Sequence, residues 1–88
     1  MRKSLIKFVE VIDIYSRKDH RQRIVYVGSS EKEVRNRIKR QLDKRKRINE
    51  NRSHPRRMLI TQTPTGSEIF YDNRYIKLSV YPIKITFP

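Results

Sequence analysis

The chain has 88 residues, enough for one domain with a small core. It lacks cysteine, which excludes disulfide bridges and cysteine-based zinc sites, and nothing in it indicates secretion. Twenty-two Lys and Arg residues against nine Asp and Glu residues give a net charge of +13, which favours a polyanionic partner. No stretch approaches the roughly 20 apolar residues of a membrane span, so we expect a single cytoplasmic domain over residues 1–88.

The chain begins with a predicted β-hairpin. Residues 4–15 carry β-branched and aromatic side chains on both alternating faces, which predicts a well-covered interior strand. Residues 16–20 are a polar turn, and residues 21–28 form a second strand that ends at Gly28. The short connection predicts that the two strands pair antiparallel.

A long basic helix is predicted next, over residues 31–50. Ser30 and Glu33 have the spacing of a capping box, in which the hydroxyl accepts from the N–H of Glu33 and the carboxylate reaches back to the N–H of Ser30. The apolar stripe of the helix is narrow, enough to pack on a sheet but too thin for a helix that lies on a membrane. The stripe consists of Val34, Ile38 and Leu42.

The rest of the chain predicts strands and turns. Pro55 disfavours helix at His54 within a loop over residues 49–57. Three strands are then predicted at residues 58–62, 68–71 and 75–81. Pro82 marks a boundary or an edge position, and residues 83–87 can continue the last strand. We therefore expect an α+β fold: a small, mostly antiparallel sheet in the order β-β-α-β-β, with room for one more strand, and one long basic helix packed on it.

Most of the charge falls in the predicted helix and the loop after it. From Ser30 to Arg57, twelve Lys and Arg residues oppose four Asp and Glu residues, and eight of the twelve are Arg. The planar guanidinium fork suits bidentate contacts with phosphate. We expect the phosphates of DNA or RNA to be contacted by Arg35, Arg37, Lys39, Arg40, Lys44, Arg45, Lys46, Arg47, Arg52, Arg56 and Arg57.

Two short motifs carry a family resemblance. The sequence Asp-Ile-Tyr ends at Tyr15, ten residues intervene, and Tyr-Val-Gly begins at Tyr26 and is followed by Ser-Ser and the basic helix. This arrangement resembles the GIY-YIG nuclease family over residues 5–42. The resemblance implies that both tyrosines approach Arg37 on one side of the sheet, where the three would form the catalytic group of a nuclease. It also implies a Mg²⁺ ion held by a glutamate.

The chain departs from the family pattern at three points. Asp13 stands where the family has its first glycine, and Gln41 stands where it often has a histidine. The family holds its metal with a glutamate on a later helix, and no later helix is predicted here, so Glu68 is the remaining candidate ligand. His20 and His54 have no partners at metal-binding spacing. We therefore expect no metal and no cofactor unless the chain is a nuclease.

Three functions remain open from the sequence. The first is nucleic-acid binding on a degenerate GIY-YIG-like scaffold, without catalysis. The second is inhibition, as in small phage-encoded inhibitors of host defence or transcription, by binding an acidic or nucleic-acid-binding surface of a host protein; this parallel rests on size and charge. The third is a minimal metal-dependent endonuclease.

Overall fold

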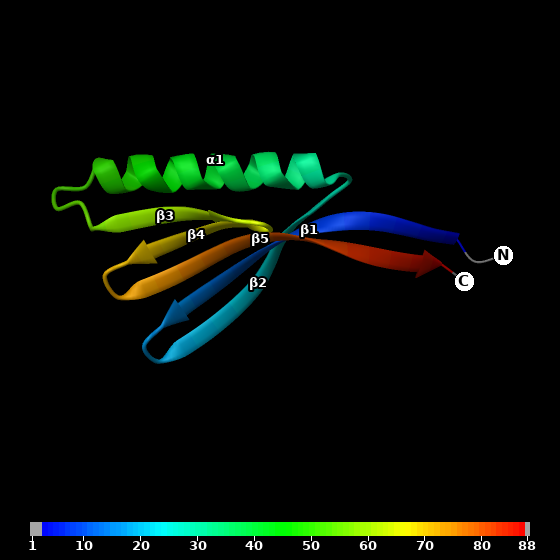
Figure 1. Cartoon of the computed structure of the whole chain (residues 1–88), viewed down its shortest axis with the longest axis horizontal. Helices are drawn as coiled ribbons and strands as arrows, with labels where there is room; N and C mark the ends of the chain where they lie inside the picture. The colour runs from blue at the N-terminus through cyan, green and yellow to red at the C-terminus, as the bar shows by residue number, and fades with distance from the viewer. Residues whose placement is uncertain (1–2, 88) are drawn as a thin grey trace.

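The computed structural model describes residues 3–87 and shows an α+β fold of one helix and five strands (Figure 1). The element order begins β-β-α-β-β, as predicted, and one more strand follows. The elements are β1 (Lys3–Ser16), β2 (Asp19–Gly28), α1 (Glu31–Glu50), β3 (Met58–Thr63), β4 (Gly66–Tyr71) and β5 (Arg74–Phe87). In the described part of the chain, no helix is long and apolar enough to cross a membrane.

All five strands belong to one antiparallel sheet in the order β2-β1-β5-β4-β3. The two longest strands, β1 and β5, are 14 residues each and pair from Lys3 with Phe87 to Ser16 with Arg74. The prediction that β1 is an interior strand is therefore confirmed, because β2 and β5 flank it. The hairpin of β1 and β2 is also confirmed, with a bulge where the register shifts between Glu10 and Val11.

The predicted strands are shorter than the observed ones. β4 begins at Gly66 and β5 runs unbroken through Pro82. Pairing between β4 and β5 ends at Ser79, so Pro82 lies where β5 has β1 alone as its neighbour. A residue without an N–H is tolerated at such a position. The edge position expected for Pro82 is thus correct, and the boundary is not.

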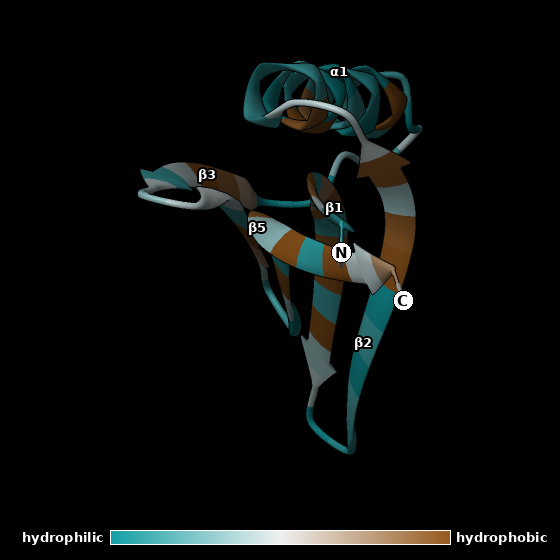
Figure 2. Cartoon of the chain, turned by 90° about the vertical axis from the view of Figure 1, so that its right-hand side faces the viewer, coloured by the Kyte–Doolittle hydropathy of each residue, from teal (hydrophilic) through white to brown (hydrophobic). Residues whose placement is uncertain are grey.

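The core lies between α1 and one face of the sheet (Figure 2). Val34 and Ile38 of the predicted stripe are buried against the sheet, and Leu42 packs at the margin of the same cluster. The sheet side of the cluster comprises Ile69, Ile76, Leu78 and Val80. Apart from the exposed Ile48, the rest of α1 is hydrophilic (Figure 2), so burial of this narrow stripe holds α1 in place.

The two faces of β1 differ in what they meet. Side chains alternate along a strand, so Glu10, Ile12 and Ile14 lie on the helix side. Asp13 and Tyr15 lie on the opposite face, which α1 does not cover. This alternation decides which of the sequence-predicted site residues meet.

Candidate nucleic-acid interface

A polar cluster joins the start of α1 to the end of β2. Ser30 caps the helix by accepting from the N–H of Glu33 at 3.2 Å, as predicted. The Glu33 carboxylate accepts from the N–H of Ser29 at 3.1 Å, one residue earlier than the expected Ser30, and from the Tyr26 hydroxyl. The Tyr26 hydrogen bond lowers the pKa of Glu33 and raises that of Tyr26. Tyr26 therefore keeps its proton at neutral pH and is a poor base.

The half-buried Arg37 turns its guanidinium toward the sheet, where it contacts Tyr26 and Glu10. Its guanidinium lies 4.6 Å from the centre of the Tyr26 ring, and its Nε lies 3.0 Å from Oε2 of Glu10. Glu10 is fully buried, whereas the Arg37 side chain is 35% exposed. The Nε–H is not aligned for a hydrogen bond to the carboxylate, so the contact is mainly Coulombic. Burial raises the pKa of Glu10, although Arg37 and then Arg45 oppose the shift.

The structure separates the two tyrosines of the GIY-YIG-like motifs. Tyr26 stacks under Arg37 as the resemblance implies. Tyr15 lies on the opposite face, where its ring stacks on His20 at 4.2 Å and lies 5.2 Å from Tyr75. The expectation that both hydroxyls approach Arg37 is therefore wrong for Tyr15, because Tyr15 is five residues from Glu10 and strand alternation turns it away.

Glu68, the candidate metal ligand, is also far from Arg37 in the sheet. It is opposite Lys77 on β4 and β5 and interacts with the hydroxyl of Tyr75, whose pKa burial and this hydrogen bond raise to about 12. Ile69, the next residue, packs under the helix, so Glu68 faces the other way. Within residues 3–87, no group of three or more His, Asp or Glu side chains could hold a metal ion. Glu68, Tyr26 and Arg37 are thus not brought together.

The basic residues divide into engaged and free groups. Of the eleven residues expected at the interface, Arg37 pairs with Glu10, and Arg35 pairs with Glu31 at 2.9 Å and donates to the carbonyl of Pro64. The other nine form no ion pair with a carboxylate among the described residues. They are Lys39, Arg40, Lys44, Arg45, Lys46, Arg47, Arg52, Arg56 and Arg57.

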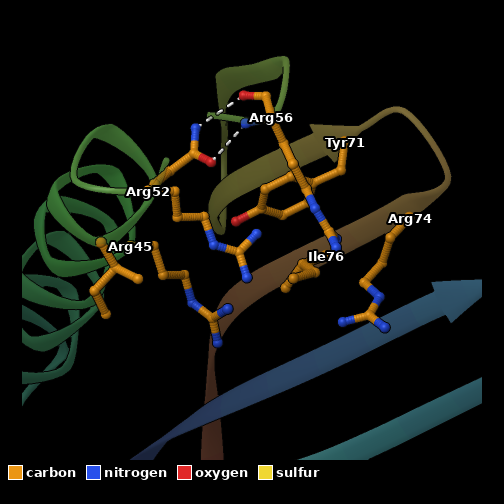
Figure 3. Close-up of a pocket in the computed structure, with 8 residues that line it drawn as sticks. Arg45, Arg52, Arg56, Tyr71, Arg74 and Ile76 are labelled. Carbon is orange, nitrogen blue, oxygen red and sulfur yellow. Dashed lines mark hydrogen bonds between the residues drawn. The ribbon is translucent and has the colours of Figure 1, made fainter. Parts of the chain in front are cut away.

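Six of these nine residues line two hollows. Arg40, Lys44 and Arg47 line an open hollow on the outer face of α1, together with Asp43. A second cavity, of about 190 Å³, lies between the last turns of α1, the loop after it and the sheet. Its charged lining is Arg45, Arg52, Arg56 and Arg74. Figure 3 shows these four side chains converging over Ile76 from three different elements. We call this cavity the arginine pocket.

Sequence reasoning missed four residues of the site. Glu10 lies within the strand predicted at residues 4–15, and an acid on the helix side of such a strand requires a buried cation nearby. Arg74 falls between the strands predicted at residues 68–71 and 75–81. Arg21 and Arg23 alternate on one face of β2, opposite Ile14 and Ile12, which places both on the helix side. That alternation was readable in the sequence; the approach of Arg74 to α1 was not.

The helix dipole does not explain why so many cations gather near the C-terminal end of α1. Carbonyl groups at the end of α1 attract positive charge, and Arg47 lies in the last turn. Such an interaction is worth roughly 0.3–1 kcal/mol for an exposed group and fades within one turn. Arg56 and Arg74 lie outside the helix, so their convergence has another basis.

Comparisons of the chain with protein-family models, with curated proteins and with solved structures gave no match. The GIY-YIG resemblance therefore stays a prediction from the sequence motifs.

Proposed function

We propose that this protein binds nucleic acid through its phosphate groups, using the outer face of α1 and the loop that follows. Binding of this kind reads charge and shape rather than base sequence. The aliphatic stems and planar heads of the exposed arginines suit phosphates that lie on an open surface. The membrane-surface alternative has less support, because the only apolar stripe of α1 is buried in the core.

The observation that carries the proposal is that five of the acidic side chains are already paired with partners within the protein. Glu10, Asp13, Asp19, Glu31 and Glu33 each contact a partner within the chain, near the start of α1 or on the β1–β2 hairpin. From residue 39 to residue 57, nine free Lys and Arg side chains face only Asp43 and Glu50. The second half of the helix therefore carries a large excess of positive charge, which favours a polyanion.

We infer binding rather than cleavage from the same geometry. Arg37 is paired with Glu10, and the Tyr26 hydroxyl donates a hydrogen bond to Glu33. Tyr15 lies on the other face of the sheet. These three side chains do not enclose a common position for a scissile phosphate.

A salt titration tests the proposal. Fluorescence anisotropy measures binding to labelled duplex DNA, single-stranded DNA and RNA, with Mg²⁺ added in parallel samples that are checked for cleavage. The double variant Arg40→Glu with Lys44→Glu should weaken binding on the order of tenfold at moderate salt. It should flatten the slope of log affinity against log salt by about 2 for duplex DNA, because up to two phosphate contacts are lost.

A matched control variant distinguishes the loss of one binding surface from a general effect of lower net charge. The exposed Lys3 and Lys84 lie near the outer ends of β1 and β5, at the opposite end of the molecule from the end of α1 (Figure 1), and their reversal to Glu changes the net charge equally. Equal weakening by both double variants would contradict the assigned surface. Absence of binding to all three nucleic acids, with capture of an acidic protein from nuclease-treated lysate, would instead support the inhibitor function.

A further inference from the structure

The arginine pocket brings four unpaired arginine side chains together around one small cavity. Its four guanidinium groups come from α1, from the loop over residues 51–57 and from the first residue of β5. No carboxylate lines the cavity, and within residues 3–87 none of the four is in an ion pair. Nε of Arg45 is shielded from solvent and has no hydrogen-bond partner. Converging like charges repel one another, so an anion among them would relieve a cost that the free protein bears.

The loop that supplies two of the arginines is fixed in place. The side-chain amide of Asn49 donates to the carbonyl of Arg56 at 2.9 Å and accepts from the N–H of Arg56 at 3.0 Å (Figure 3). The N–H of Arg52 also bonds to the carbonyl of Asn49, at 3.2 Å. These bonds hold the loop against the end of α1 before any ligand arrives. A site ordered in advance loses less entropy on binding.

The pocket continues into a second basic hollow. The helix, the loop and the β4–β5 hairpin border it, with Ile48, Tyr71 and Ile76 as its apolar lining. It shares Arg74 with a neighbouring cavity that is lined by Asp19, Arg21 and Arg23 of β2. Arg21 is paired with Asp19 at 2.8 Å, whereas Arg23 is in no ion pair among the described residues. A strand whose terminal phosphate lies among the four arginines can therefore place its next phosphate beside Arg23.

The positive charge of the pocket favours a terminal phosphate over an internal one. A phosphodiester carries one negative charge, whereas a phosphate monoester carries about −1.5 to −2 at pH 7 and has three free oxygens. Four guanidinium forks match the monoester better. The cavity is smaller than the roughly 300–1,000 Å³ typical of sites for drug-sized molecules, which fits a phosphate with part of its sugar.

We propose that the arginine pocket captures the terminal phosphate of a nucleic-acid strand, with Arg45, Arg52, Arg56 and Arg74 as its ligands. This inference rests on the proposed function and makes it specific for strand ends. The Tyr71 ring borders the site on the β4 side, beside the terminal sugar or base. Arg23 contacts the phosphate next to the terminal one.

Matched oligonucleotides test the inference without any change to the protein. Single strands of one sequence carry a 5′-phosphate, a 3′-phosphate or hydroxyls at both ends. One phosphorylated end should bind about tenfold more tightly than the hydroxyl form, and the two phosphorylated arms identify which end is taken. Equal binding of all three would overturn the pocket while leaving the proposed function intact. No binding of any of them would overturn both.

Two variants locate the effect. Arg52→Gln with Arg74→Gln should remove the preference for a phosphorylated end. Arg40→Gln with Arg47→Gln should instead weaken the binding of all three oligonucleotides and leave the preference unchanged. A preference that survives the first pair would contradict the assignment. As a readout that does not depend on the variants, a dinucleotide phosphorylated at the end that the oligonucleotides identify should raise the melting temperature of the wild-type protein more than its hydroxyl form or inorganic phosphate does. An equal rise with inorganic phosphate would reduce the pocket to a simple anion site and overturn the inference.

Discussion

At the scale of single residues, the pair of Glu10 and Arg37 links the first strand to the helix. A fully buried carboxylate is tolerated only beside a cation, and Arg37 is the cation in contact with it. The Tyr26 ring holds the guanidinium from its other side, and Glu33 holds Tyr26. Arg37 thus organises the start of α1, which is a structural role where the sequence predicted a functional one.

Removal of Arg37 alone should destabilise the protein. Arg37→Met leaves the Glu10 charge buried without a partner, which costs roughly 3–5 kcal/mol in fully buried pairs. Because Arg37 is 35% exposed, we expect about 2–3 kcal/mol. The double variant Glu10→Leu with Arg37→Met should recover most of the loss, since no charge remains to be buried. Urea unfolding of the four proteins measures the coupling, and additive losses would contradict the role of the pair.

Glu10 should also make stability depend on pH. Its pKa is raised above the ordinary 4.5, so the folded state holds this proton at a pH where the unfolded chain has released it. Stability from this group is therefore complete below pH 4.5 and falls as pH rises through the folded pKa. Glu10→Gln keeps the shape and cannot titrate. The free energy of unfolding of the wild type, relative to this variant, should decline as the pH rises above 4.5; a flat difference would show that Glu10 has an unshifted pKa.

At the scale of elements, the approach of α1 to β2 depends on Gly28. A Cβ at this position would lie 2.8 Å from Cγ2 of Val34 and 3.1 Å from Cε1 of Tyr26. Val34 is fully buried in the helix stripe. The glycine of the Tyr-Val-Gly motif therefore allows a helix to lie close to a strand, and this packing role is independent of any catalysis.

Gly28→Ala should destabilise the protein by about 1–3 kcal/mol, as expected for overpacking in a tight core. The loss should be smaller when Val34 is already Ala, because the clash is with that side chain. Gly66→Ala is the contrasting case: its Cβ would lie 2.0 Å from the backbone carbonyl of Leu78, which no side-chain truncation can relieve. Thermal melts of the variants measure both effects. An undiminished loss in the Val34→Ala background would refute the proposed contact.

At the scale of the whole molecule, local patterns predicted more of the fold than of the site. Alternation in β1, the capping spacing of Ser30 and the helix stripe all specify elements through near neighbours in the chain, and these predictions hold. The arginine pocket joins residues 45 and 74, which meet only because β5 crosses beneath α1. Similarly, the separation of Tyr15 from Arg37 follows from which face α1 covers. A single sequence carries no direct signal of either.

The central strands of the sheet come from opposite ends of the described chain, and this has a consequence for synthesis. On the ribosome, β1 emerges first and can pair with β2, but its other edge has no partner until residues 74–87 follow. During that interval Val9 and Val11, both buried in the finished protein, border an open strand edge. Closure of so long a loop is slow compared with local pairing. The nascent protein therefore completes its sheet only after β5 has left the exit tunnel, and until then the unpaired edge of β1 is open to chaperones or to another nascent chain.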